Sequence, residues 1–172
     1  MNRKPSGFTL MEILVVMGII GVVAAMMIPS IMPTSSTKLT ASARTVMADL
    51  LYAQSQAITN QDNVYVVFST TSSQYRLQSP LGTNIKRSAG ADVVTMGSYN
   101  KEMPFAKLGA LATGDVAFTT LGFDALGQPY TVSGTGANIA LTQPGLIKLV
   151  SPDESFTITL SVQPFTGEVT AQ

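Results

Sequence analysis

Apolar residues are concentrated near the start of the chain. Residues 8–28 read FTLMEILVVMGIIGVVAAMMI, and Glu12 is the only charged residue among them. As a helix this run would be about 31 Å long at the α-helical rise per residue, which matches the roughly 30 Å hydrocarbon core of a bilayer. Arg3 and Lys4 precede it. The positive-inside rule therefore predicts one membrane span, with a cytoplasmic N-terminus and residues 34–172 outside.

A secretory signal peptide is the simplest alternative for this segment. Arg3 and Lys4 would form its basic region, and Ala24 and Ala25 would supply small residues. However, the apolar run is longer than the usual 7–15 residues of a signal peptide, and no clear A-x-A cleavage site follows it. A signal peptide also gives no reason for Glu12, whose carboxylate costs on the order of 3 kcal/mol near the bilayer centre and less near an interface. Glu12 is therefore a candidate functional residue, although its place near the helix start lowers the cost.

The apolar run is followed by two prolines and then by an amphipathic pattern. Pro29 and Pro33 disfavour helical geometry, so residues 29–34 are expected to form a kink, an unwound stretch or a helix break. A second helix is expected from about residue 37 to residue 59. Its apolar stripe follows helical spacing and consists of Leu39, Ala43, Val46, Leu50, Ala53 and Ala57. We expect Met47, Leu51 and Ile58 to widen the stripe on one side. The widened stripe is broad enough to pack on a sheet.

Beyond residue 63 the pattern becomes that of β-strands. The alternation of apolar and polar residues predicts strands at Val64–Thr70, Gln74–Ser79, Asp92–Met96, Asp115–Thr119, Asn138–Thr142, Leu146–Val150 and Ser155–Val162. Pro80–Gly90 is expected to be a loop, Leu121–Tyr130 a turn-rich connection, and Gly97–Gly114 has no readable pattern. The fold class expected is α+β, with a long N-terminal helix whose second half packs on an antiparallel β-sheet.

Composition argues against an enzyme. The 172 residues contain no histidine and no cysteine, so there is no Ser–His triad, no thiolate nucleophile, no disulfide and no cysteine-ligated metal. Composition leaves a Ser–Lys dyad open, but no motif indicates one. The ten basic and ten acidic residues give zero net charge, which argues against a nucleic-acid binder that relies on overall positive charge. We therefore expect no catalytic residues and no cofactor.

The first twelve residues carry a specific motif. Lys4-Pro5-Ser6-Gly7 is followed by Phe8-Thr9-Leu10-Met11-Glu12 and then by the unbroken apolar run. This arrangement resembles the prepilin signal of type IV pilins and type II secretion pseudopilins. The resemblance implies that a prepilin peptidase cuts the Gly7–Phe8 bond on the cytoplasmic face and that Phe8 is then N-methylated. Glu12 becomes the fifth residue of the mature chain, where the family keeps its glutamate, and Pro29 the twenty-second, where many members keep a proline.

The resemblance gives Glu12 a partner. In a filament, its carboxylate can meet the amine of Phe8 on a neighbouring subunit, and two charges that are costly alone in an apolar core become tolerable together. Such pairing would favour one axial register between subunits. An acid near a helix N-terminus also complements the helix dipole, and both roles can hold.

Two further segments narrow the resemblance. The helix pattern Arg44-x4-Asp49-Leu50-Leu51-x-Ala53-x3-Ala57-Ile58 precedes the strand Val64–Phe68. The end of the chain reads Phe123-Asp124-x2-Gly127-Gln128-Pro129, and then Ile158-x-Leu160-x-Val162-x-Pro164-x-Thr166-Gly167-Glu168-Val169. These segments are similar to the GspH/FimT-type minor pseudopilins, which implies the same fold and a role as a filament subunit.

Two charged pairs are tested as binding sites. Asp153 and Glu154 indicate a hairpin loop; a calcium site needs 6–8 oxygen ligands, and the acids here are scattered, so no metal is expected. Lys86 and Arg87 form the only basic pair outside the first seven residues. Removal of residues 1–7, which contain Arg3 and Lys4, would leave eight basic and ten acidic residues, a net side-chain charge of −2. Since each phosphate contact needs a cation, DNA binding is not expected.

Taken with the resemblance, these features predict a structural subunit and not an enzyme. The expected organisation is a leader peptide at 1–7, a transmembrane and filament-core helix at 8–28, a proline hinge at 29–36 and a globular domain at 37–172. Filament assembly is assigned to Phe8, Glu12 and Pro29. The expected partners are the prepilin peptidase and methyltransferase, other pilin or pseudopilin subunits through the N-terminal helix, and an inner-membrane assembly platform.

The expected location is the bacterial inner membrane, as a single-pass protein with a periplasmic globular domain, and then a pilus or pseudopilus. Two alternatives remain open. One is a major pilin with a GspH-like domain, which would dominate sheared filaments. The other is a single-span, membrane-anchored periplasmic enzyme or binding protein, which would keep its full N-terminus. The sequence leaves open which filament machine the chain serves.

Overall fold

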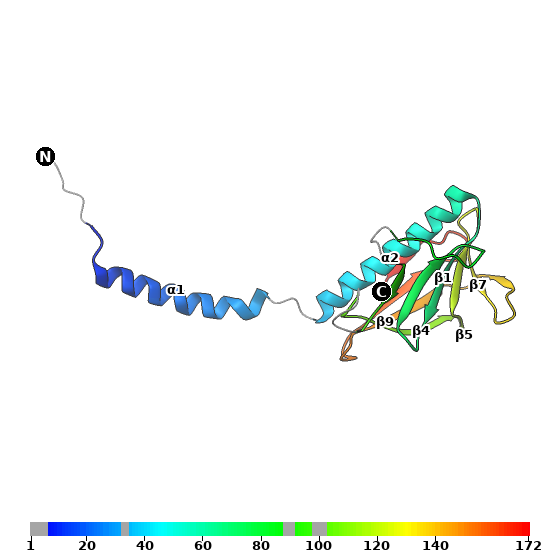
Figure 1. Cartoon of the computed structure of the whole chain (residues 1–172). Coiled ribbons are helices and arrows are strands. Elements are labelled where there is room, and N and C mark those ends of the chain that lie inside the picture. Colours follow the sequence, from blue (N-terminus) through cyan, green and yellow to red (C-terminus); the bar gives the residue numbers. More distant parts are fainter. Residues whose placement is uncertain (1–6, 32–34, 88–91, 98–102) are drawn as a thin grey trace. The chain divides into compact units, whose positions relative to one another are not determined.

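The computed structural model describes residues 7–31, 35–87, 92–97 and 103–172, without the side chains of residues 26–31. The chain divides into two units, residues 1–34 and residues 35–172. The first contains helix α1 (Leu10–Ile31). The second contains helix α2 (Ser35–Asn60) and all the strands (Figure 1).

Helix α1 continues through Pro29 and ends at Ile31. A proline inside a helix removes one backbone hydrogen bond, yet the helix persists for two residues beyond it. An unwound stretch or a helix break therefore does not begin at Pro29, and a kink there stays a prediction. Residues 32–34, the rest of the segment in which an interruption was expected, lie outside the described residues.

Helix α2 buries the predicted apolar stripe. Each of its six members is at most 2% exposed, and the helix begins two residues before the predicted start. Met47 packs against the core as predicted. Leu51 and Ile58 do not, because 46% and 45% of their surfaces are exposed. Three of the six stripe residues are alanines, so the strands can approach α2 closely along a narrow line, and side chains beside that line stay in solvent.

Eleven strands are found in the described part of the second unit. They are β1 (Val64–Ser69), β2 (Gln74–Gln78), β3 (Val93–Thr95), β4 (Lys107–Thr113), β5 (Val116–Ala117), β6 (Thr120–Phe123), β7 (Pro129–Val132), β8 (Asn138–Ala140), β9 (Gly145–Val150), β10 (Thr157–Val162) and β11 (Val169–Ala171). They form two sheets, in the orders β3-β2-β1-β6-β7-β8 and β11-β10-β9-β4-β5. Every pairing between neighbouring strands is antiparallel.

Four strands differ from the sequence prediction. Strand β11 lies beyond Ser155–Val162, the last strand predicted. Strand β4 lies in the segment that had no readable pattern. Strands β6 and β7 occupy both ends of Leu121–Tyr130, which was predicted to be a connection, and only the five residues between them form a turn. The prediction failed there because Gly122 and Pro129 are residues that normally weaken a strand.

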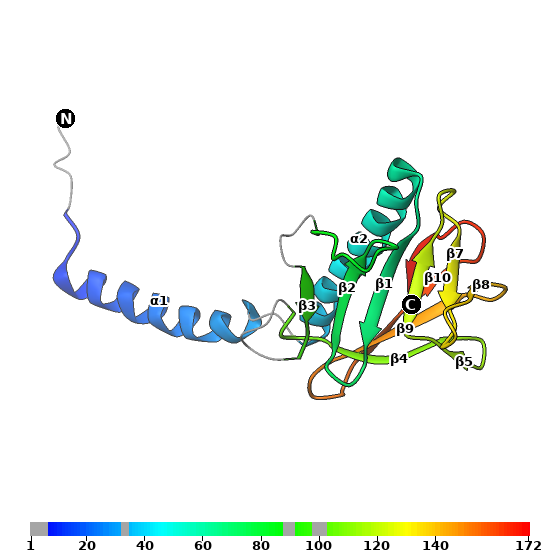
Figure 2. The same cartoon turned by 45° about the vertical axis from the view of Figure 1, so that its right-hand side comes forward.

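Helix α2 packs against strands of both sheets. It contacts β1 and β6 of the first sheet and β9, β10 and β11 of the second, and Figure 2 shows β1 and β2 alongside it. The stripe of α2 joins one continuous core with fully buried strand residues that include Val66, Leu77, Leu121, Phe123, Ile147 and Leu160. The core therefore fixes the two sheets on one helix and leaves the β-turns at the ends of the strands free to carry other roles.

Candidate functional site

The start of α1 is capped by Thr9. The backbone N–H of Glu12 donates to Thr9 Oγ1 at 3.3 Å, and the N–H groups of Glu12 and Ile13 lie 3.1 and 3.2 Å from the Thr9 carbonyl oxygen. Thr9 is therefore the N-cap, and Glu12 is the third helical residue. This Thr-x-x-Glu spacing is that of a capping box. The sequence interpretation missed Thr9, although the spacing alone could have indicated it.

The described surface of α1 is apolar and uncovered. Every side chain from Phe8 to Ala25 is exposed, including Phe8 at 79% and Leu10 at 82%. A groove of about 310 Å³ runs along one face and is lined by Phe8, Glu12, Ile13, Val16, Met17 and Ile20. Proteins rarely leave an apolar surface of this extent in water, so it marks a site that another apolar surface covers.

The predicted site residues fall into two places on α1. Phe8 and Glu12 line the same groove, and Gly7 beside them is exposed with no atom within 4 Å of a Cβ added to it. Pro29 is 17 residues beyond Glu12, about 26 Å along the helix axis. The structure therefore brings Gly7, Phe8 and Glu12 together and leaves Pro29 separate. No helix among the described residues is both long and apolar enough to cross a membrane.

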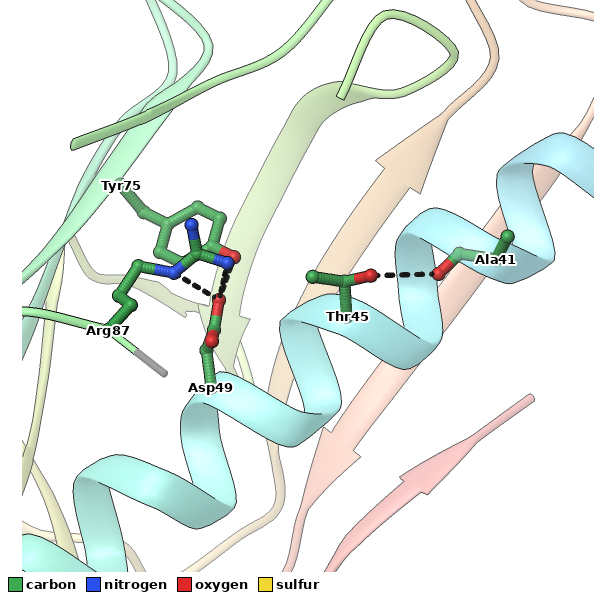
Figure 3. A network of polar contacts seen from close by, with 5 residues as sticks. All are labelled: Ala41, Thr45, Asp49, Tyr75 and Arg87. Atoms are coloured by element: carbon green, nitrogen blue, oxygen red, sulfur yellow. Dashed lines mark hydrogen bonds and ion pairs between the residues drawn. The ribbon is translucent and has the colours of Figure 1, made fainter. Parts of the chain in front are cut away.

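A buried ion pair joins α2 to the segment after β2. Arg87 Nε donates to Asp49 Oδ2 at 2.7 Å, and the Nη2 atom of Arg87 and the hydroxyl of Tyr75 also donate to this oxygen. The Arg87 guanidinium lies 5.7 Å from the centroid of the Tyr75 ring. All three residues are at most 5% exposed. Figure 3 shows Asp49 pointing from α2 toward both partners.

This ion pair explains two charged residues that the sequence left unassigned. Arg87 is buried and paired, so Lys86 and Arg87 form no basic surface patch for phosphate groups. Asp49 follows Val46 by three residues and precedes Ala53 by four, so it belongs to the buried side of α2. That spacing was the feature of the sequence that could have placed Asp49 on the buried side of the helix. The partner could not be found, because Arg87 is 38 residues away in a loop.

Gln54 connects α2 to two turns. Its side-chain Nε2 donates to the carbonyl oxygen of Gly127 at 2.9 Å and to that of Thr166 at 2.8 Å. Gly127 and Gly167 have φ values of +81° and +68°, and a Cβ on Gly167 would lie 2.5 Å from Gln54 Nε2. The two glycine turns that carried the GspH-like resemblance thus meet at one glutamine side chain.

Tyr130 occupies the space above a glycine. It pairs with Gly122 across β6 and β7, and a Cβ on Gly122 would lie 2.4 Å from the Tyr130 ring. The Tyr130 hydroxyl has no hydrogen-bond partner in the described part of the chain. Burial raises the pKa of Tyr130 well above its ordinary value, and Tyr65, Asp124 and Asp62 raise it further. Asp124 directly follows β6 and Asp62 lies two residues before β1, so both lie near this end of the first sheet.

A second cavity, of about 310 Å³, lies at the start of α2. It is lined by Ser35, Lys38, Gly97, Pro104, Phe105, Pro152 and Asp153. The Lys38 ammonium lies 4.4 Å from the centroid of the Phe105 ring, so the cation faces an aromatic ring. The described lining therefore includes one serine, one ammonium group and one carboxylate. Among the described residues, no group of three or more acidic side chains could hold a metal ion.

Comparisons with known proteins match both units. Residues 2–28 match a family model described as the prokaryotic N-terminal methylation motif, and residues 42–165 match one described as type II transport protein GspH. The chain is also similar to the minor pseudopilin EpsH from the type 2 secretion system of Vibrio cholerae. That match has a TM-score of 0.55 and 13% identity, over 78% of this chain and 96% of that one, so it shows the fold alone. No curated protein matches the chain significantly.

Proposed function

The chain belongs to the GspH family of type II transport proteins, and from this premise we propose how each of its two units acts. Members of this family are structural subunits of the pseudopilin type, which are anchored in a membrane, processed through the N-terminal methylation motif and assembled with other subunits into a filament. The proposal concerns which residues of this chain perform each of these steps.

The proposed cleavage site is the Gly7–Phe8 bond, followed by N-methylation of Phe8. Gly7 is exposed and has open space around it, so a peptidase can approach the backbone. The preceding Lys4-Pro5-Ser6 and the following apolar run fit the methylation motif matched over residues 2–28. The processed chain would begin with an amine on Phe8, two residues from the first residue of α1.

The observation that carries the assembly role is the groove on α1. It places the carboxylate of Glu12 among apolar side chains that other protein or lipid must cover. In the filament, this groove receives the Phe8 amine of a neighbouring subunit, and the resulting ion pair offsets the cost of burying either charge alone. Pro29, which removes one hydrogen bond from α1, allows the helix to bend or unwind where subunits pack.

Before assembly, the precursor is held in the bacterial inner membrane by residues 8–28. Its N-terminus faces the cytoplasm, where the peptidase acts, and residues 37–172 fold in the periplasm. The proposed span includes residues 26–28, which lie beyond the last α1 side chain that the structure describes. An inner-membrane platform then adds the processed subunit to the filament. The hinge predicted at residues 29–36 overlaps the end of α1 at residues 29–31 and the start of α2 at residues 35–36.

The proposed role is structural and not catalytic. The chain has no histidine or cysteine, so it can form neither a Ser–His triad nor a thiolate nucleophile. The GspH family match favours a minor subunit over a major pilin and over an anchored enzyme or binding protein. The filament does its mechanical work through assembly, and this chain contributes one building block.

The test is the intact mass of the chain purified from cells that contain the prepilin peptidase. We expect a mature protein that lacks residues 1–7 and carries one added methyl group. Gly7→Val should leave the full-length precursor, because a side chain then enters the peptidase at the scissile bond. Gly21→Ala on α1 is the matched control, since a Cβ there also meets no atom within 4 Å. A wild-type chain that keeps Met1, or one cut near Ala25, would contradict the proposal.

A further inference from the structure

Four exposed apolar side chains lie around Gln54. Leu51 and Ile58 are three residues before it and four after it on α2, so all three share one side of the helix. Leu126 is in the turn between β6 and β7, and Phe165 is in the turn between β10 and β11. Their exposed fractions are 46% for Leu51, 45% for Ile58, 76% for Leu126 and 69% for Phe165. We refer to these five residues as the Gln54 face.

The contacts that assemble the Gln54 face are specific. Gln54 donates to the carbonyl oxygens of Gly127 and Thr166, the residues directly after Leu126 and Phe165. The Cδ1 atom of Ile58 lies 2.8 Å from the position of a Cβ on Gly127. Phe165 has a φ of +67°, a conformation that a bulky side chain rarely adopts. The fold therefore presents these apolar side chains in a fixed arrangement.

The three segments that form the Gln54 face contain acidic residues and no basic ones. These segments are residues 51–62, 121–129 and 163–169, and the charged residues within them are Asp62, Asp124 and Glu168. Asp62 and Glu168 are exposed, and Asp124 is partly exposed. Helix α2 also ends here, at Asn60, with no basic residue in its last turn. The partial negative charge of a helix C-terminus adds to that of the three carboxylates.

We propose that the Gln54 face docks a neighbouring protein of the secretion filament whose own surface carries lysine or arginine side chains around an apolar centre. An apolar centre with a charged rim is the usual anatomy of a protein interface, and the acidic rim selects a basic partner by charge complementarity. The same rim repels lipid headgroups and nucleic acids, which carry phosphate. The inference rests on the filament role proposed above, but it concerns the globular unit and not α1.

Site-specific photo-crosslinking in cells that contain the complete secretion machine tests the docking surface. A photoreactive residue replaces Leu126 in one full-length variant and Leu81 in the control. Leu81 is 92% exposed, in a segment outside the Gln54 face. We expect the Leu126 variant alone to crosslink to another protein of the filament, through a peptide that contains lysine or arginine. Equal yields at both positions, a crosslink to lipid or to a second copy of this chain, or a partner peptide without basic residues would overturn the proposal.

Charge reversal tests the rim. The double substitution Asp62→Lys and Glu168→Lys should lower the Leu126 crosslink about tenfold, because like charges then oppose each other across the interface. Asp115→Lys and Asp92→Lys, in segments outside the face, should leave the yield unchanged. Yields are compared only within processed chains recovered in the filament fraction, with matched circular dichroism spectra. Normal recovery with no loss of crosslink overturns the docking proposal, whereas absence of the wild-type chain from that fraction overturns the filament role instead.

Discussion

The carboxylate of Asp49 accepts three hydrogen bonds on the buried face of α2. Its donors come from β2 and from the segment that follows β2, so one oxygen ties this part of the chain to α2. Burying both charges of an ion pair is costly, but removing only one partner is costlier because the other charge stays buried and unpaired. Asp49 and Arg87 are therefore expected to depend on each other strongly.

The first prediction follows from this dependence. Asp49→Ala should lower the free energy of unfolding by about 3–5 kcal/mol, since Arg87 is left as an unpaired buried cation. The double variant Asp49→Leu with Arg87→Met should recover most of that loss, because it removes both charges. Urea unfolding of the full chain in detergent, followed by circular dichroism, measures both effects. Arg44→Ala, an exposed position on the same helix, is the control, and a double variant no more stable than Asp49→Ala would contradict the argument.

Tyr130 gives a pH-dependent prediction. Burial raises its pKa above the ordinary value of 10.0, so above pH 10 the unfolded chain loses the phenolic proton first and unfolding becomes more favourable. The stability that this residue contributes is complete below pH 10 and should decrease above it, by at most about 1.4 kcal/mol per pH unit. Tyr130→Phe has no proton to lose and also removes a buried hydroxyl that has no hydrogen-bond partner among the described residues. It should match or exceed the wild-type stability at pH 7.

Thermal unfolding between pH 7 and pH 11 checks this prediction. The wild-type Tm should fall more steeply above pH 10 than the Tm of Tyr130→Phe. Tyr52→Phe on α2 shows the effect of removing a different phenol. Parallel curves for the wild type and Tyr130→Phe would show that ionisation of Tyr130 does not govern alkaline unfolding.

At the scale of elements, the clearly periodic segments could be predicted, and strand length did not decide the outcome. The seven-residue strand β4 was missed, whereas the short strands β3, β5 and β8 lie within predicted segments. The six-residue stripe of α2 and the hairpin of β1 and β2 follow directly from spacing. Strands β6 and β7 were missed because Gly122 is a poor strand residue until the Tyr130 ring covers it. Such a contact exists only in the folded sheet, so no local pattern reports it. The Gln54 contacts could not be predicted from the sequence for the same reason, because they join residues that are 73 and 112 positions apart.

Gln54 provides the prediction at this scale. Gln54→Ala should destabilise the globular unit by about 1–3 kcal/mol, because two turn carbonyls lose their shared donor. Gln56→Ala on the same helix is the matched control, since Gln56 contacts only its helical neighbour Asn60 in the hydrogen bonds described. Hydrogen exchange should be faster in residues 124–128 and 163–167 of the Gln54→Ala variant. Unchanged exchange in both turns would show that the glycine conformations hold the turns without the glutamine.

At the scale of the whole molecule, the chain separates stability from assembly. The globular unit buries its apolar stripe within its own sheets, whereas the apolar side chains described on α1 are all exposed. The roles of Phe8 and Glu12 could be anticipated because the motif is local and continuous. The cap formed by Thr9 adds a second explanation for Glu12, since an acid three residues after the N-cap also stabilises an isolated helix. Pairing with the Phe8 amine requires the negative charge of Glu12, whereas capping does not.

The substitution Glu12→Gln separates those explanations. Glutamine serves a capping box as well as glutamate does, but it cannot neutralise the Phe8 amine of a neighbouring subunit. We expect Glu12→Gln and Glu12→Ala to be cleaved normally, since Gly7 and Phe8 are unchanged, and to be depleted alike from sheared filaments. An unpaired buried amine costs about 3–5 kcal/mol per subunit, which is enough to exclude most variant chains when wild type competes.

Thr9→Val, which removes the cap and keeps the charge, should assemble far better than either variant. Intact mass measures cleavage, and quantitative mass spectrometry of co-expressed chains measures incorporation. If Glu12→Gln assembles like the wild type while Glu12→Ala and Thr9→Val both fail, the glutamate acts by capping α1 and not by pairing with the amine of its neighbour.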